Sequence, residues 1–139
     1  MTELVRSLMS RFPVCLPTTA TVAEAARKMR DHQIGDVLVT DRGRLCGILT
    51  DRDLVVRGIA ASVGSGAPIG DLASPDPRVL RPEDPLDYAV RVMREHAVRR
   101  LPVCGDEGRP VGMLSLGDVV TDRAPGSTLA AICAAPPST

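Results

Sequence analysis

The chain has 139 residues, which is enough for one compact unit or two small half-domains with a real hydrophobic core. Its 17 basic and 17 acidic residues cancel, so its charge does not favour general binding to nucleic acid or to an anionic membrane. No apolar run approaches the roughly 20 residues of a membrane span, and the first residues lack the profile of a signal peptide. We therefore expect a cytoplasmic protein that binds neither nucleic acid nor a membrane.

The cysteines, at positions 15, 46, 104 and 133, are widely spaced and form no CxxC pair. No Cys and His residues lie at the close spacing of a zinc site. We expect reduced, mostly buried thiols, and we expect neither a metal site nor a cofactor.

Apolar periodicity and capping residues predict alternating helices and strands. A capping box of Thr21 and Glu24, for example, begins a helix whose apolar stripe runs to about His32. The first half is predicted to contain a helix at 2–9, a small strand at 12–17, the helix at 22–32, a hairpin with strands at 37–39 and 45–49, a closing helix at 51–57 and a flexible linker at 60–68.

The second half repeats the first. A shift of 64 residues aligns Ser10 with Ser74 and His32 with His96, and one extra residue near Gly105 changes the shift to 65. The second copy of the long helix is predicted to begin at Asp84, with Pro85 in its first turn. The predicted organisation is residues 1–59 for repeat 1 with its N-terminal helix, 60–68 for the linker, 69–123 for repeat 2 and 124–139 for a mobile tail, within which residues 129–133 can form a helical turn against a partner.

One short pattern occurs in both repeats. Gly47-Ile48-Leu49-Thr50-Asp51-Arg52-Asp53-Leu54 returns as Gly112-Met113-Leu114-Ser115-Leu116-Gly117-Asp118-Val119. Each copy predicts an apolar strand that runs into a helix, with a hydroxyl residue at the junction and an aspartate three residues later. Two interpretations stay open: a polar pocket made twice, or two capping boxes whose acids only satisfy the starts of the helices.

These features resemble a pair of CBS domains, the unit often called a Bateman module. The resemblance depends on "GILTDRDL" and "GMLSLGDV", which close the two copies, and on "RRLPV" at residues 99–103, and it covers residues 5–122. It implies an α/β fold of two β-α-β-β-α repeats, related by pseudo-two-fold symmetry and packed into one module. It also implies a regulatory, non-catalytic module that binds AMP, ADP, ATP or S-adenosylmethionine in the cleft between the repeats, forms a homodimer and signals to a protein partner by conformational change.

The resemblance also implies roles for individual residues. Asp53 and Asp118 match the ribose-binding aspartate, and a carboxylate can accept both hydrogens of a cis-diol. Thr50 and Ser115 match a hydroxyl that touches sugar or phosphate. Arg52, Arg99 and Arg100 match basic positions near the phosphates, and Val14, Cys15, Val37, Val79 and Leu101 match the apolar slot for adenine.

The two predicted sites are not equivalent. Repeat 1 has Asp36 where repeat 2 has Arg100, and repeat 2 has Gly117 where repeat 1 has Arg52. A carboxylate at position 36 would repel a nearby phosphate. We expect ligand selectivity to depend on these differences.

Two rival functions remain. Asp51 and Asp53 could hold Mg²⁺ in a phosphatase or nucleotidyl hydrolase, although repeat 2 lacks the pair and no general base or nucleophile is evident beside it. Alternatively, both acids only cap helices and the chain is a ligand-free dimerisation module.

Overall fold

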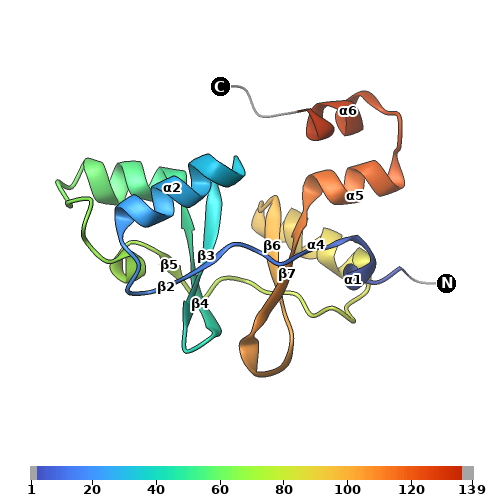
Figure 1. Ribbon diagram of the computed structural model, residues 1–139. Helices are drawn as coiled ribbons and strands as arrows, with labels where there is room; N and C mark the ends of the chain where they lie inside the picture. Colours follow the sequence, from blue (N-terminus) through green and yellow to red (C-terminus); the bar gives the residue numbers. More distant parts are fainter. Residues whose placement is uncertain (1–2, 136–139) are drawn as a thin grey trace. The chain divides into compact units, whose positions relative to one another are not determined.

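The computed structural model describes residues 3–135, which divide into two compact units. The repeat-1 unit contains residues 13–77 and the hairpin turn 106–110. Within the described range, the repeat-2 unit contains residues 3–12, 78–105 and 111–135. Each unit combines one β-sheet with helices, so the α/β class predicted from the sequence is confirmed (Figure 1).

The repeat-1 unit is built on a four-stranded sheet in the order β2-β3-β4-β5. Strand β2 is parallel to β3, and the other neighbours are antiparallel. The core of this unit contains Leu16, Ala25, Met29, Val37, Leu49 and Ile69. Its elements are β2 (Cys15–Pro17), α2 (Val22–His32), β3 (Asp36–Asp41), β4 (Arg44–Thr50), α3 (Asp51–Asp53), the π-helical turn η1 (Leu54–Ile59), the 3-10 turn η2 (Ile69–Asp71) and β5 (Ser74–Pro75).

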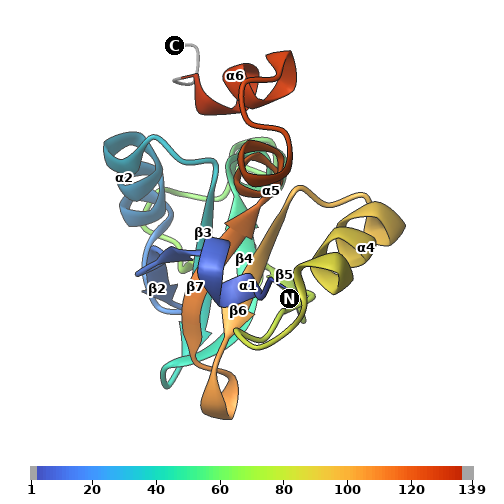
Figure 2. The same cartoon turned by 90° about the vertical axis from the view of Figure 1, so that its right-hand side faces the viewer.

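The repeat-2 unit has a three-stranded sheet in the order β1-β7-β6. Leu80 takes the place that β2 has in the other unit, because it pairs in parallel with Val103. The core contains Val5, Leu86, Ala89, Leu101 and Leu114. The remaining elements of this unit are α1 (Val5–Leu8), β1 (Ser10–Arg11), α4 (Leu86–His96), β6 (Arg100–Cys104), β7 (Pro110–Ser115), α5 (Leu116–Arg123) and α6 (Thr128–Ala134) (Figure 2). The turn η3 (Asp106–Gly108), between β6 and β7 in the chain, is counted with the repeat-1 unit.

The long helices begin differently. Thr21 caps α2 as predicted, since its Oγ1 accepts a hydrogen bond from the Glu24 amide at 3.1 Å. Asp84 does not cap α4, and that prediction was wrong. Its carboxylate accepts a hydrogen bond from the Arg81 amide at 2.8 Å, which leaves Pro85 as an N-cap without a side-chain bond.

Backbone geometry confirms the alignment of the repeats. Gln33 and Ala97 end the two long helices in the left-handed conformation, with φ of 54° and 53°, and they are 64 residues apart. Gly43 and Gly108 occupy the hairpin turns with φ of 81° and 72°, and they are 65 residues apart. The extra residue therefore lies between position 97 and position 108, as expected from the sequence.

The short leading strand of each repeat pairs with the sheet of the other repeat. Ser10 of β1 pairs with Met113 of β7, and Ser74 of β5 pairs with Ile48 of β4. Helix α1, which precedes β1 in the chain, also belongs to the repeat-2 unit. There the Val5 amide donates a hydrogen bond to the Asp84 carbonyl at 2.9 Å. The N-terminal helix was predicted to belong with repeat 1, which it precedes in the chain, and its backbone hydrogen bonds join it to the residues before α4 in the repeat-2 unit.

Two further segments were predicted to be flexible or mobile. Residues 60–68 were predicted to be a flexible linker, but the Val22 and Ala23 amides at the start of α2 donate to the carbonyls of Ala67 and Ser65 at 2.9 Å. The predicted mobile tail contains α6, while residues 136–139 lie outside the described range. No helix within residues 3–135 is long and apolar enough to cross a membrane.

Candidate functional site

The repeated hydroxyl and carboxylate form a capping box in both units. Asp53 Oδ2 accepts from the Thr50 amide at 2.9 Å, and Thr50 Oγ1 accepts from the Asp53 amide at 3.1 Å. Ser115 and Asp118 repeat the same two bonds at the same distances. This geometry arises because the last residue of a strand is also the N-cap of the next helix. Both carboxylates therefore cap a helix, and these bonds alone do not decide between the two interpretations.

The capping bonds leave hydrogen-bond acceptor positions unused on both the Asp53 and the Asp118 carboxylate. Each ionised carboxylate has two oxygens with about four acceptor positions, and the box uses Oδ2 alone. Oδ1 of Asp53 lies 3.9 Å from Nε of Arg57. Oδ1 of Asp118 has no hydrogen-bond or ion-pair partner among the residues that the structure describes. Each carboxylate therefore keeps acceptor positions that the capping box does not use.

The glycine that opens each motif makes room for the exchanged strand. A Cβ atom on Gly47 would lie 3.0 Å from the carbonyl oxygen of Ser74, and one on Gly112 would lie 2.9 Å from that of Ser10. Both distances are shorter than ordinary van der Waals contacts. In each motif the glycine therefore allows the close approach of the leading strand, and the hydroxyl and carboxylate cap the helix. The second oxygen of the carboxylate takes no part in the cap.

The first helical turn differs between the repeats. In repeat 1, the Asp51 carboxylate accepts from the Arg52 amide at 2.8 Å and would lie 3.3 Å from a Cβ atom on Gly35. Asp51 thus packs beside Gly35, whereas Asp53 bonds back to Thr50. No group of three or more His, Cys, Asp or Glu side chains within residues 3–135 could hold a metal ion.

A cavity of about 550 Å³ lies beside the motif of repeat 2. Its walls combine α5 with α1, which is distant in sequence and provides Ser7 and Leu8, and with the next helix α6, which provides Cys133 and Ala134. Sequence reasoning placed none of these four in the site, because nothing in their local pattern indicates where either helix packs. The α5 side provides Ser115, Gly117, Asp118, Thr121 and Asp122.

The arginines predicted to contact phosphate are exposed, and Arg99 lies elsewhere. Arg52, Arg99 and Arg100 all have exposed side chains. Arg99 lines a separate cavity of about 420 Å³ with Met93 and Val119. Its carbonyl accepts from the Leu116 amide at 2.7 Å, so its backbone holds the start of α5. The structure therefore unites Ser115 with Asp118 in one cavity but does not add Arg99 to it.

The apolar residues predicted to hold adenine have different surroundings. Val37 and Leu101 are only 1% and 2% exposed and belong to the two hydrophobic cores. Val14 and Cys15 are partly buried, and burial raises the pKa of the Cys15 thiol. Val79 is exposed and lines the pocket described next.

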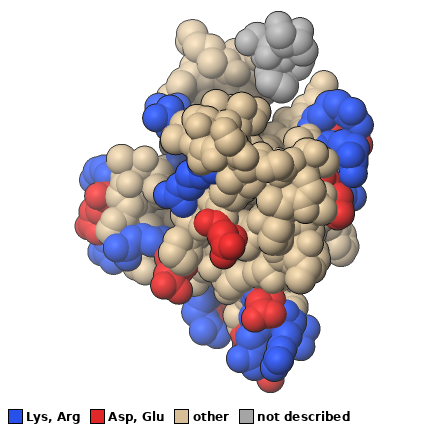
Figure 3. Space-filling model, turned by 90° about the vertical axis from the view of Figure 1, so that its left-hand side faces the viewer, with Lys and Arg blue, Asp and Glu red and all other residues tan. Residues whose placement is uncertain are grey.

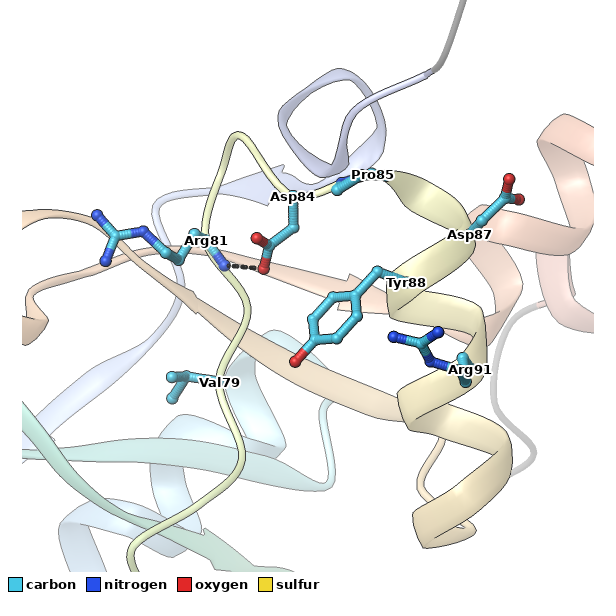
Figure 4. Close-up of a pocket in the computed structure, with 7 residues that line it drawn as sticks. All are labelled: Val79, Arg81, Asp84, Pro85, Asp87, Tyr88 and Arg91. Carbon is cyan, nitrogen blue, oxygen red and sulfur yellow. Dashed lines mark hydrogen bonds between the residues drawn. The ribbon is translucent and has the colours of Figure 1, made fainter.

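That pocket, of about 750 Å³, lies beside the start of α4 (Figure 4). Tyr88 and Arg91 form one side, where the guanidinium carbon lies 5.3 Å from the centre of the ring. Asp87 pairs with Arg123, and Arg81 Nε lies 2.7 Å from a Glu83 carboxylate oxygen. Asp87 and Arg81 of the pocket thus each pair with an oppositely charged side chain. Neither repeated motif contributes a residue to the pocket.

Charge on the surface is mixed. On the face shown in Figure 3, basic and acidic side chains lie interspersed and form no field of one sign. This distribution agrees with equal numbers of basic and acidic residues. It gives no footprint for a nucleic-acid backbone on that face.

Comparisons with known proteins bear on the repeats. The family model described as CBS domain matches twice, at residues 5–58 and 69–124. Hypoxic response protein 1 of Mycobacterium tuberculosis is 36% identical over 116 residues, which cover 82% of this chain and 80% of that protein. A crystal structure of Hypoxic Response Protein I with two coordinated zinc ions is 35% identical with a TM-score of 0.77, over 85% of this chain and 97% of that one.

A second solved structure carries a nucleotide. It is CBS domain protein PAE2072 from Pyrobaculum aerophilum complexed with AMP, which is 30% identical with a TM-score of 0.77. The match covers 88% of this chain and 95% of that one. Two family matches, two aligned capping motifs and this likeness to a solved structure agree, and the chain belongs to the CBS domain family, as a pair of CBS domains.

Proposed function

We propose that this CBS pair is a regulatory sensor of adenosine-containing nucleotides, with AMP, ADP, ATP and S-adenosylmethionine as candidate ligands. One observation carries the proposal. Asp118 lines a 550 Å³ cavity and keeps a carboxylate oxygen without a partner among the described residues. The volume lies within the roughly 300–1,000 Å³ that is usual for small-molecule sites.

The neighbouring groups suit a nucleoside phosphate. The two oxygens of Asp118 can accept both hydrogens of a ribose cis-diol. The start of α5, beside the Ser115 hydroxyl, carries the positive end of the helix dipole, which favours an anion. A relative that is 30% identical was solved with AMP, which supports adenosine as the ligand class.

The two motifs are proposed to bind with unequal affinity. Arg52 adds a cation to the first turn in repeat 1, whereas Gly117 adds no side chain in repeat 2. Asp36, which is buried, occupies the place of Arg100. Ligand binding would shift the balance between conformations of the chain, and a protein partner would respond to that shift.

We further propose that the sensor is a cytoplasmic homodimer. Val55, Val56 and Ile59 on η1 are 55%, 49% and 72% exposed, and such a row of apolar side chains is typical of a surface that a second copy covers. No disulfide joins any of the four cysteines, all of which lie within residues 3–135, and this agrees with a reducing compartment.

Isothermal titration calorimetry with AMP, ATP and S-adenosylmethionine tests the proposal. The double variant Asp53→Asn with Asp118→Asn keeps an acceptor oxygen for each cap and removes the charge that a diol needs. We expect at least one ligand to bind and the double variant to lose about tenfold or more in affinity, since charged hydrogen bonds contribute roughly 1.5–3 kcal/mol each. Asp71→Asn, at an exposed acid outside the motifs, is the control and should bind normally.

Two results would overturn the proposal. If none of the ligands produces heat, the ligand-free dimerisation module becomes the better explanation. If a ligand binds with equal affinity to the double variant, the site lies elsewhere and the two carboxylates only cap helices.

A further inference from the structure

The residue one helical turn after each proposed ribose aspartate differs in charge between the repeats. Four residues after Asp53 comes Arg57, whose Nε atom lies 3.9 Å from Asp53 Oδ1. Four residues after Asp118 comes Asp122, and both of these carboxylates line the cavity of about 550 Å³. Side chains four residues apart are neighbours on one face of a helix. The aspartate of repeat 1 therefore has a cation beside it, whereas that of repeat 2 has a second anion.

The charges around this cavity are mainly negative. Within the part of the chain that the structure describes, no lysine or arginine lines it. Arg123, the next residue along α5, forms an ion pair with Asp87. A further acid lies against Asp122, because a hydrogen bond to Asp122 raises the pKa of the Glu3 carboxyl. The positive end of the α5 dipole is equivalent to roughly half an elementary charge, which is less than the charge of two carboxylates.

This negative charge bears on how many phosphates a ligand can bring into the cavity. A phosphate monoester carries about −1.5 to −2 charges at pH 7, and each further phosphate of ADP or ATP adds negative charge. A cavity of about 550 Å³ has the volume of a sphere roughly 10 Å across, which is about one Debye length at ~0.1 M salt. Asp118 and Asp122 therefore repel a phosphate held anywhere in the cavity, whatever the orientation of the nucleotide. The start of α5 can favour one phosphate, but it does not balance the charge of three.

We propose that Asp122 restricts the repeat-2 site to adenosine ligands with at most one phosphate, so that AMP and S-adenosylmethionine bind there more tightly than ATP. This inference rests on the proposed function and names the ligand class of one of its two sites. S-adenosylmethionine fits because its sulfonium and ammonium cations outnumber its one carboxylate. Arg57 occupies the equivalent position in repeat 1, 65 residues earlier, so the same restriction does not apply there.

Calorimetry on a parent variant, Asp53→Asn, measures the repeat-2 site separately. The quantity of interest is the ratio of the ATP Kd to the AMP Kd, which we expect to be about ten or more in the parent. Asp122→Asn keeps the shape of the side chain and removes its charge, so the ratio should fall at least about threefold. Asp122→Arg, which copies the charge of repeat 1, should lower the ratio further. S-adenosylmethionine should respond in the opposite direction and bind more weakly to both variants.

Glu95→Gln is the matched control. Glu95 is exposed on α4 in the same unit and lines none of the cavities of about 420, 550 and 750 Å³. It changes the net charge by as much as Asp122→Asn does, so the ratio should stay at the parent value if the position of the charge matters. Raising the salt from about 0.05 to 0.5 M should lower the ratio in the parent and have less effect in Asp122→Asn, because salt screens the repulsion.

The possible results separate the restriction from the site. If ATP binds the parent as tightly as AMP, or if Asp122→Asn leaves the ratio unchanged, the restriction is wrong and the repeat-2 site remains supported. An equal fall of the ratio in Glu95→Gln would assign the effect to net charge and would also overturn the restriction. If none of the three ligands binds the parent, the repeat-2 nucleotide site is wrong, and the restriction with it.

Discussion

The glycine at the start of each motif gives the sharpest prediction, which concerns stability rather than ligand binding. In Gly112→Ala the new methyl group would lie 2.9 Å from the Ser10 carbonyl oxygen and 2.7 Å from Met9 Sδ. The methionine side chain can move, but the carbonyl belongs to β1, which pairs with β7 at this point. The leading strand must therefore shift outward or detach.

The magnitude follows from three contributions. Overpacking of a well-packed site costs roughly 1–3 kcal/mol, and each weakened backbone hydrogen bond adds about 1 kcal/mol. Alanine also restricts the unfolded chain, which offsets about 0.4–1 kcal/mol. We expect Gly112→Ala to lower the free energy of unfolding by about 1–3 kcal/mol.

Urea unfolding of the ligand-free protein, followed by circular dichroism, measures this loss. With a typical slope of roughly 1–3 kcal/mol per molar urea, a loss of about 2 kcal/mol moves the midpoint by about 1 M. Gly64→Ala is the control, because nothing lies within 4 Å of the added Cβ atom, and it should be neutral or slightly stabilising. Unchanged stability of Gly112→Ala together with weaker AMP binding would refute the strand-crossing explanation and assign this glycine to the ligand.

Three smaller effects can be measured in the same way. Ser115→Ala removes the bond to the Asp118 amide, so we expect a loss of about 1 kcal/mol in urea unfolding, and full stability would show that the cap contributes nothing. Ala97→Gly should raise stability by about 0.5 kcal/mol, because φ of 53° strains alanine more than glycine, and a decrease would contradict this account. Burial raises the pKa of the Cys15 thiol, so a smaller fraction of it is thiolate at pH 8. We expect alkylation of Cys15 to be slower than alkylation of exposed Cys133, and the rate at Cys15 to keep rising above pH 8. Equal rates at the two cysteines would argue against the burial of Cys15.

The sequence predicted the helices, caps and turns that depend only on residues close to one another in the chain. The stripe that contains Ala25 and Met29, the Thr21 cap and the hairpin turn at Gly43 are determined by residues within one or two helical turns or one hairpin. The alignment of the repeats also predicted that Thr50 and Ser115 occupy equivalent positions. Both capping boxes were therefore predictable, and their geometry is confirmed.

Features that depend on distant contacts were not predictable. Strand β1 has two residues, too few for any periodicity, and its partner lies about a hundred residues away in the chain. The alanine-rich α6 has the composition of a mobile tail, and its place over Gly117 depends on packing rather than on pattern. The Asp84 carboxylate could accept either from an amide at the start of α4 or from an amide before it in the chain. It accepts from the Arg81 amide, in the loop that precedes the helix.

The exchange of leading strands also determines what a break in the chain would do. A cut between residues 60 and 68 leaves one fragment with α1 and β1, which belong to the repeat-2 unit, and another with β5, which belongs to the repeat-1 sheet. Each fragment would hold a piece that the other needs, so the nicked protein should remain a noncovalent complex. That loop is therefore a natural point at which to divide the protein into two fragments that reassemble, as split reporter proteins do.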